Sequence, residues 1–292
     1  MPVTARLEAG RSRAIAGAVL VAAGLVVVYW KPLVWLVEAW WSDGNYSHGF
    51  LIPPLAAYFA WERRDRLRVA ERHPSWLGLL VLAGSLMLLL AGLLGAELFV
   101  TRVSFVGALA GIVLFLFGWR HLRILLFPLA FLFLMIPIPS LIFNQVAFPL
   151  QLLASKFGQA CMATVSIPVL REGNVLILAN TTLEVAEACS GIRSLVSLIT
   201  LGVIYGYFMD PRGWVRAAIV LSAVPIAIVA NGARVAGTGI AAHYFGAAAA
   251  QGFFHEFSGW VVFVVAFALM LVVQQVIHRF SPRPATSGEA RA

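Results

Sequence analysis

The segment with the clearest chemical potential is Cys189-Ser190-Gly191-Ile192-Arg193-Ser194, in which a thiol and a guanidinium are four residues apart at the expected start of a helix. If this helix begins at Ser190, its positive dipole end and Arg193 one turn along both favour thiolate over thiol. The thiolate is the nucleophilic form of cysteine. The alternative is that Cys189 is a small buried apolar residue and Arg193 an interfacial anchor, because free cysteine is commonly inert.

Two further groups complete a set that is suited to acyl transfer. Arg234 ends the segment Asn231-Gly232-Ala233-Arg234, and His255 begins the segment His255-Glu256-Phe257-Ser258-Gly259-Trp260. Cysteine can attack a peptide carbonyl, histidine can accept or return the proton, and arginine can stabilise the oxyanion or the thiolate. His48 and His243 are the competing candidates for the base.

The cysteine count limits what else Cys189 could do. The chain has only two cysteines, Cys161 and Cys189. Two are too few for a thiolate metal cage but enough for one disulfide, so a disulfide between them is a rival interpretation of Cys189. We expect neither a metal ion nor a cofactor.

The composition places these groups in a membrane. Hydrophobic residues make up 61% of the 292 residues and charged residues only 12%, whereas soluble domains average about 25% charged. The net charge of +8 alone would suggest nucleic acid. The basic residues, however, cluster in short segments between apolar runs rather than on one face. We therefore expect the lipid bilayer as a partner and exclude nucleic acid.

The apolar runs predict an all-α polytopic membrane protein with about eight transmembrane helices, several of them near the ~20 residues that a crossing needs. The first run follows three arginines, as in a signal peptide, but no small-residue cleavage site follows it cleanly. We expect it to be retained and to end at Lys31-Pro32. The expected spans are 14–30, 47–61, 76–94, 100–117, 122–138, 191–209, 214–236 and 257–277.

The charge distribution predicts an orientation. The positive-inside rule is satisfied if both termini and the arginine-rich segment 63–72 are cytoplasmic. Cys189, Arg234 and His255 then lie at the extracytoplasmic, periplasmic ends of three successive spans in the cytoplasmic (inner) membrane. The exceptions to the bias among the 21 basic residues are Lys31, Arg102, Lys156, Arg171, Arg193 and Arg234.

A different pattern separates the fifth and sixth spans. Residues 141–165 mix polar side chains into apolar sequence, which indicates a helix lying in the interface or partly re-entering. Three short β-rich runs follow, and open strands cannot lie in lipid, so we expect a small extracytoplasmic hairpin or meander before the cysteine. The predicted organisation is one transmembrane domain, 1–280, with 139–190 as an insertion and 281–292 as a disordered cytoplasmic tail.

Three segments together resemble the exosortase/archaeosortase family of multi-pass transpeptidase-like enzymes. They are the run from Glu187 to Ser194, the run from Asn231 to Val235, and His255 with Ser258-Gly259-Trp260. Tyr46-Ser47-His48-Gly49 also resembles the N-terminal region of the family. The cysteine motif is fairly specific, and the order of the segments adds to the match, which covers roughly residues 14 to 278.

The resemblance implies a catalytic triad of Cys189, Arg234 and His255. It also implies an enzyme that recognises a C-terminal sorting signal on exported proteins. In bacterial exosortases this signal (PEP-CTERM) is a Pro-Glu-Pro-type motif followed by a hydrophobic helix and a basic tail. The enzyme would cleave at the motif, form a thioester on Cys189, and pass the acyl group to an unknown acceptor linked to exopolysaccharide or the cell surface.

Four further residues are candidates for substrate binding. Arg193 could support the thiolate or bind the glutamate of the motif, and we favour the second role because Arg234 already serves the first. Glu187 and Glu256 add negative charge near the triad, and could orient His255 or contact the substrate. His48 belongs to the early family-like segment.

Two alternatives to a transpeptidase stay open at this point. The first is a non-enzymatic transporter or scaffold of the export or exopolysaccharide machinery. Transporters tend to place polar groups near the bilayer midplane and to show paired halves, whereas here the polar groups are expected at the outer rim and no internal repeat is evident. The second is a protease that hydrolyses its substrate without transfer.

Overall fold

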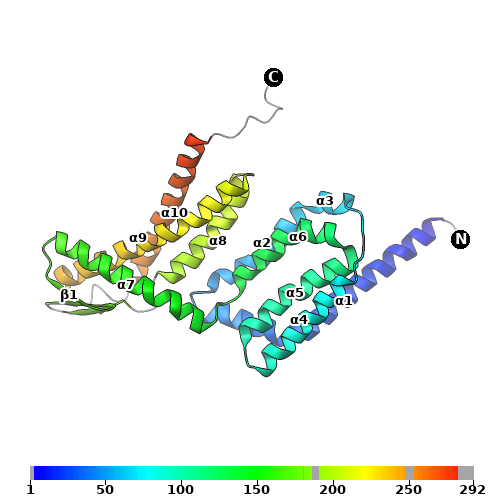
Figure 1. Ribbon diagram of the computed structural model, residues 1–292, viewed down its shortest axis with the longest axis horizontal. Coiled ribbons are helices and arrows are strands. Elements are labelled where there is room, and N and C mark those ends of the chain that lie inside the picture. Colours follow the sequence, from blue (N-terminus) through cyan, green and yellow to red (C-terminus); the bar gives the residue numbers. More distant parts are fainter. Residues whose placement is uncertain (1–2, 180, 186–190, 247–252, 282–292) are drawn as a thin grey trace, which may run out of the picture. The chain divides into compact units, whose positions relative to one another are not determined.

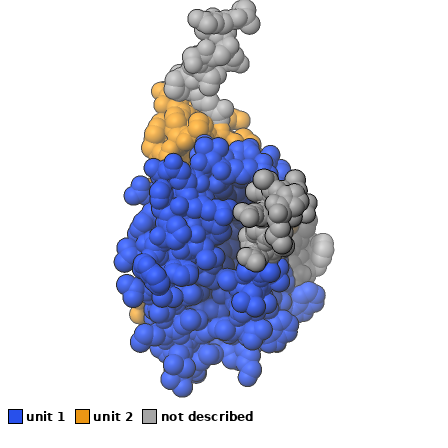
Figure 2. Space-filling view, turned by 90° about the vertical axis from the view of Figure 1, so that its right-hand side faces the viewer, with its two compact units in different colours: residues 1–138 blue, residues 139–292 orange. Residues whose placement is uncertain are grey.

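The computed structural model (Figure 1) describes residues 3–179, 181–185, 191–246 and 253–281. Side chains are not described at 3–15, 18 and 253–258. Contacts divide the chain into two compact units, residues 1–138 and 139–292, which are blue and orange in Figure 2. The second unit begins where the sequence predicts the insertion between the fifth and sixth spans.

In the described part of the first unit, all regular secondary structure is helical. Its apolar runs form helices because, in lipid, a backbone polar group must be bonded within its own segment. The elements are α1 (Val3–Ser42), η1 (Ser47–Leu51), α2 (Ile52–Glu62), α3 (Arg64–Val69), α4 (Leu77–Leu94), α5 (Leu98–Phe117), α6 (Trp119–Phe131) and η2 (Leu132–Met135).

The expectation that Lys31-Pro32 ends the first helix is wrong, because α1 continues through Pro32 to Ser42. Proline removes one N–H and crowds the carbonyl of the preceding turn, which breaks many helices in water. In an apolar environment, ending the helix would leave more backbone N–H and C=O groups without hydrogen-bond partners than one proline does. Proline is therefore tolerated inside the helix. The tryptophan-rich segment 33–41 is therefore part of α1.

Small residues hold α4 and α5 together as a close hairpin. A Cβ at Gly111 would lie 2.7 Å from the backbone nitrogen of Leu82, and one at Gly92 would lie 2.8 Å from Cγ2 of Thr101. Lipid provides no hydrophobic driving force for two helices to associate. Helix pairs in membranes are instead stabilised by van der Waals packing, which such close backbone approach improves.

The segment between α1 and α2 is tied to the chain after α6. Trp40 Nε1 donates to the carbonyl of Met135 (2.8 Å), and the Tyr46 hydroxyl donates to that of Ile138 (3.4 Å). His48 Nε2 lies 3.2 Å from the carbonyl oxygen of Leu134. These bonds fix the early polar segment within the first unit.

The second unit adds a small sheet to four helices. The sheet has the order β1-β2-β3 and is antiparallel, with Val169 opposite Leu178 and Leu176 opposite Leu183. It confirms the predicted β-rich meander before the cysteine segment. The elements are α7 (Ser140–Thr164), β1 (Val169–Glu172), β2 (Val175–Leu178), β3 (Thr182–Glu184), α8 (Ile192–Met209), α9 (Gly213–Phe245) and α10 (Phe253–Phe280).

The sheet packs on α7 and on the second half of α9. Its buried cluster unites Met162 of α7, Leu176 of β2 and Val235 of α9, together with Val185 just after β3. Glycines at the α7–α9 contact allow this approach, since a Cβ at Gly158 would lie 2.8 Å from Val235 Cγ1. The packing also explains why α9 runs on to Phe245, past the end expected near residue 236.

Within the described ranges, six helical segments are long and apolar enough to cross a membrane. A broken pair, 119–135 with 140–164, would make a seventh if it forms one span. This agrees closely with the predicted all-α polytopic fold of about eight spans. The helix observed in the expected span 47–61 is short, since α2 has 11 residues and rises only ~16 Å. The six segments are Val19–Ser42, Leu77–Leu94, Leu98–Phe117, Ile192–Met209, Gly213–Phe245 and Gly259–Phe280.

Asp210, at the end of α8, connects the turn between α8 and α9 to the end of α10. Its fully buried carboxylate accepts from Arg212 through Nη2 (2.8 Å) and Nε (3.0 Å) and lies 3.0 Å from His278 Nε2. Arg212 in turn donates to the carbonyl of Ser281 (2.7 Å), and Arg216 donates to that of Asp210 (2.6 Å). The α8–α9 turn is thereby bound to the end of α10.

We predict that Asp210→Asn destabilises the protein in detergent by about 3 kcal/mol, because it leaves the partly buried guanidinium of Arg212 without its counter-ion. Hydrogen bonds from Arg212 lower the pKa of Asp210 from 3.8 to about 2. A depressed carboxyl pKa contributes stability above its unfolded value and loses it as pH falls through its folded value. The difference between the two proteins should therefore shrink from about pH 4 to about pH 2.

The control for this prediction is Asp65→Asn. Asp65 lies 3.6 Å from Arg68 in a pair whose side chains are 74% and 75% exposed. Exposed pairs contribute about 0–1 kcal/mol, so this change should be nearly silent in thermal unfolding. Equal effects of the two substitutions would contradict the structural role of Asp210.

Candidate functional site

The candidate nucleophile precedes a helix that starts at a left-handed glycine. Gly191 is the N-cap of α8 with φ +79°, and the N–H of Leu195 donates to its carbonyl (2.8 Å). The helix thus begins at Ile192, two residues later than expected. Cys189 lies outside the described residues. Its position in the chain is two residues before the N-cap, near the end of the helix that carries partial positive charge.

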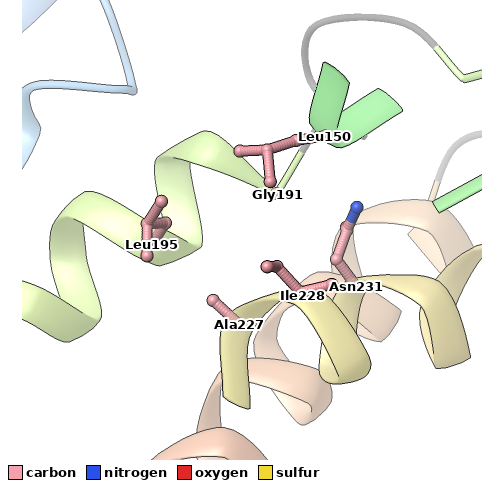
Figure 3. Close-up of a pocket in the computed structure, with 6 residues that line it drawn as sticks. All are labelled: Leu150, Gly191, Leu195, Ala227, Ile228 and Asn231. Carbon is pink, nitrogen blue, oxygen red and sulfur yellow. The ribbon is translucent and has the colours of Figure 1, made fainter. Parts of the chain in front are cut away.

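Asn231 of α9 packs directly on this glycine. A Cβ at Gly191 would lie 2.8 Å from Cγ and 3.0 Å from Nδ2 of Asn231, so only glycine fits there. The Asn231 side chain projects from α9 beside the start of α8 in Figure 3. Asn231 is buried, with 4% of its surface exposed. The polar amide is therefore held against the N-cap of α8.

A narrow crevice separates the two helices below this contact. It has about 10 Å³ of free volume, which is room for about one water molecule. A substrate side chain does not fit into it. The lining residues, labelled in Figure 3, are Leu150, Gly191, Leu195, Ala227, Ile228 and Asn231.

Arg234 lies one turn beyond Asn231 on α9 and reaches α10. A Cβ at Gly259 would lie 3.2 Å from Nη2 and 3.3 Å from Cζ of Arg234. The guanidinium is thus stacked on the α10 backbone at a position where a larger residue would push it away. Arg234 is half-buried, and its Nε is buried.

The backbone of α10 brings the third candidate into the same region. His255 is one helical turn before Gly259, and residues four apart lie on the same face of a helix. Its side chain is not among those described. The geometry of the whole predicted triad is therefore not described. Three elements do meet in this part of the chain. The start of α8 contacts α9 through Gly191 and Asn231, and α9 contacts α10 through Arg234 and Gly259.

This meeting point concentrates positive charge. The start of α8 contributes its helix dipole, Arg193 is exposed in the first turn of that helix, and the Arg234 guanidinium lies on the neighbouring α9. Positive potential favours a thiolate and a developing oxyanion. The arrangement is therefore suited to nucleophilic chemistry by a cysteine near residue 191.

The remaining predicted site residues are placed less directly. Glu187 lies outside the described residues, and the side chain of Glu256 is not described. His48 belongs to the first unit, where its Nε2 lies 3.2 Å from the carbonyl oxygen of Leu134. His243, the other competing base, is half-buried near the end of α9, where it contacts the Tyr244 ring.

Two contacts around the site were not predicted from the sequence. Asn231 and Gly259 both appear in the family-like segments, but neither was assigned a role. The available signal was spacing, because Asn231 is three residues before Arg234 and Gly259 is four residues after His255, which places each pair on one helix face. No group of three or more His, Cys, Asp or Glu in the described ranges is arranged to hold a metal ion.

We predict that Gly191→Ala slows alkylation of Cys189 about tenfold or more, because it strains the left-handed turn and pushes Asn231 away. The measurement is the rate of labelling by a membrane-impermeant maleimide in a Cys161→Ala background. Gly246→Ala is the control for strain alone, since Gly246 also has positive φ (+86°) but no atom within 4 Å of a Cβ. A normal labelling rate in Gly191→Ala would contradict the role of this turn.

A second prediction concerns the guanidinium. Gly259→Ala should shift Arg234 by a few tenths of an ångström and Gly259→Val by more, so that thiol reactivity and turnover fall in that order, by up to about 100-fold. Gly237→Ala, on α9 with no atom within 4 Å of its Cβ, should retain full activity. Comparable losses at 237 and 259 would indicate a general effect on the helices instead.

The family comparison agrees with this geometry. A model of the family described as Transmembrane exosortase (Exosortase_EpsH) matches residues 40–272, most of the 292-residue chain. Neither the curated proteins nor the solved structures gave a match to the chain. The matched range includes all the described site contacts, confirms the resemblance seen in the sequence motifs, and indicates a membrane transpeptidase acting on proteins. The chain belongs to the transmembrane exosortase family.

Proposed function

We propose that this protein is a membrane-embedded cysteine transpeptidase that cleaves the C-terminal sorting signal of exported proteins. The single observation that supports this best is the contact of three helices around one point, where Asn231 packs on Gly191 and Arg234 packs on Gly259. Each contact is within a turn of a residue that acyl transfer needs, Cys189 in one case and His255 in the other.

The proposed reaction has two halves. The Cys189 thiolate attacks the scissile carbonyl, and Arg234 stabilises the oxyanion that forms. The C–N bond then breaks, the imidazolium of His255 gives its proton to the leaving amine, and a thioester remains. An amine of the acceptor attacks this thioester and passes a proton to His255, so that the thiolate leaves and an amide bond forms.

The dimensions of α9 support an active site at the membrane surface. From Gly213 to Arg234 the helix rises about 31 Å, which is close to the ~30 Å thickness of the hydrocarbon core. With the Asp210–Arg212 end in the cytoplasm, as the positive-inside rule predicts, Arg234 reaches the periplasmic surface of the inner membrane. A guanidinium in that position avoids the cost of residing at the bilayer centre.

The substrate that suits this location carries its own transmembrane helix. Such a signal diffuses laterally to the enzyme and presents its polar motif at the outer surface, where Cys189 lies in this proposal. For the bacterial signal we propose a Pro-Glu-Pro-type motif, with Arg193 as the partner of its glutamate. Glu187, Glu256 and His48 remain proposed contacts for the rest of the segment. The acceptor is proposed to be linked to exopolysaccharide or to the cell surface.

We predict that Cys189→Ala abolishes processing of a tagged reporter in intact cells, by at least about 1,000-fold, because no other group forms the thioester. Arg234→Ala and His255→Ala should each lower the rate by about 100-fold or more. The readout is the mass of the processed reporter, whose new C-terminus also separates transfer to an amine from hydrolysis.

Cys161→Ala is the matched control, because Cys161 is a free, half-buried thiol on α7 and should be dispensable. Loss of processing in both cysteine variants would favour a structural disulfide. Normal processing in Cys189→Ser cells, with export blocked when the whole gene is deleted, would instead favour a non-enzymatic transporter or scaffold.

A further inference from the structure

The last strand of the small sheet has an open edge. Among the described residues, the strand order β1-β2-β3 gives β3 a strand neighbour on one side only. On that side the ladder to β2 is complete, with Ile177 opposite Thr182 and Val175 opposite Glu184. The other side of β3 is therefore an edge at which a further strand can be added.

The backbone pattern identifies which groups face this edge. The N–H of Val185 donates to the carbonyl of Asn174 (2.9 Å), and Asn174 Nδ2 donates to the carbonyl of Val185 (3.2 Å), so both polar groups of Val185 point toward β2. Alternate residues of a strand point their N–H and C=O groups to opposite sides. The backbone groups of Thr182 and Glu184 consequently point outward. In the described part of the chain, no hydrogen bond outside the β2 ladder reaches them.

The side chains of β3 leave this edge accessible. Thr182 and Glu184 are exposed, whereas Leu183 is half-buried and packs on the cluster beneath the sheet. The buried face thus fixes the register of β3 while the edge stays in water. A short, exposed edge with a fixed register is suited to binding an extended peptide.

The edge leads directly toward the candidate active site. Val185, at the end of β3, is buried in the same cluster as Val235, the residue after Arg234. Leu183 approaches the same helix, where its Cδ1 lies 3.7 Å from a Cβ at Gly239. Along the chain, Glu184 is five residues before Cys189. A peptide paired with β3 would therefore run along the part of α9 that carries Arg234, next to the chain segment that leads to Cys189.

We propose that β3 is the docking strand of the enzyme, on which the extended segment next to the scissile bond of the substrate pairs as an additional β-strand. This inference rests on the proposed function and specifies how the same site holds its substrate. Main-chain pairing recognises an extended backbone, while side chains beside the strand supply selectivity. Pairing with Thr182 and Glu184 would hold the substrate in one register, which places one peptide bond at the cysteine.

Glu184→Pro tests the pairing directly. Proline removes the outward N–H at this position, and it is tolerated on an edge strand whose N–H faces solvent. The bonds of Val185 to Asn174 involve other backbone groups and should persist. We expect KM for an exported reporter with a Pro-Glu-Pro-type motif, hydrophobic helix and basic tail to rise about 5- to 10-fold. Glu184→Ala, which removes the side chain but keeps the N–H, should raise KM for this reporter much less than Glu184→Pro does.

Labelling of Cys189 separates a docking defect from damage to the site. In a Cys161→Ala background, Glu184→Pro should react with maleimide at the parent rate although its KM is raised. Slow labelling, or an equal defect in Glu184→Ala, would overturn the docking role of the backbone. So would normal processing by Glu184→Pro. Activity of Cys189→Ala, in contrast, would refute the proposed function itself.

A proline scan of the reporter tests the same interface without altering the enzyme. Only alternate residues of an added strand turn their N–H groups toward β3. Proline substitutions next to the scissile bond should therefore impair processing at every second position and have little effect between them. A loss that does not alternate with position would show that the substrate binds in another way.

Discussion

The candidate site depends on how closely α8 and α10 can approach the polar face of α9. That face carries Asn231 and Arg234 one turn apart, and each is met by a glycine from a neighbouring helix. Gly191 and Gly259 thus act as two recesses, into which an amide and a guanidinium fit. Without them the helices would separate by the size of a side chain, and Asn231 and Arg234 would lose their contacts with the start of α8 and with α10.

The small sheet gives this helix contact a fixed surface outside the lipid. Its buried side joins α7 and the extended second half of α9, where Met162, Val185 and Val235 pack in one cluster. The strand that leads to Cys189 is therefore held against the helix that carries Arg234. An open strand would be unstable within the hydrocarbon, so the same sheet requires an aqueous side for this end of the bundle.

The second unit separates two kinds of polar chemistry along its helices. At one end, the buried carboxylate of Asp210 pairs with Arg212 and lies 3.0 Å from Nε2 of His278, an arrangement that holds helix ends together. At the other end, Arg234 and the start of α8 concentrate positive charge near the candidate nucleophile. The long apolar part of α9 keeps these ends about one membrane thickness apart. The Asp210 network and the candidate site therefore lie toward opposite ends of α9.

The sequence by itself determined the membrane class, the approximate number of spans, the small meander and the family. These depend on local properties, such as runs of apolar residues, short β-rich segments and the order of motifs, and local properties can be read along the chain. Lys31-Pro32 was misread for the same reason, because the rule that proline ends a helix describes a chain in water and α1 continues through it in an apolar environment.

Only the tertiary structure decided which residues surround the candidate chemistry. The motifs could indicate Cys189, Arg234 and His255, but they could not show that Asn231 lies on Gly191 or that Arg234 lies on Gly259. The sequence likewise predicted strands before the cysteine, but not that β3 would have an open edge beside α9. These features depend on contacts between segments far apart in the chain, and such contacts follow from packing rather than from any local pattern.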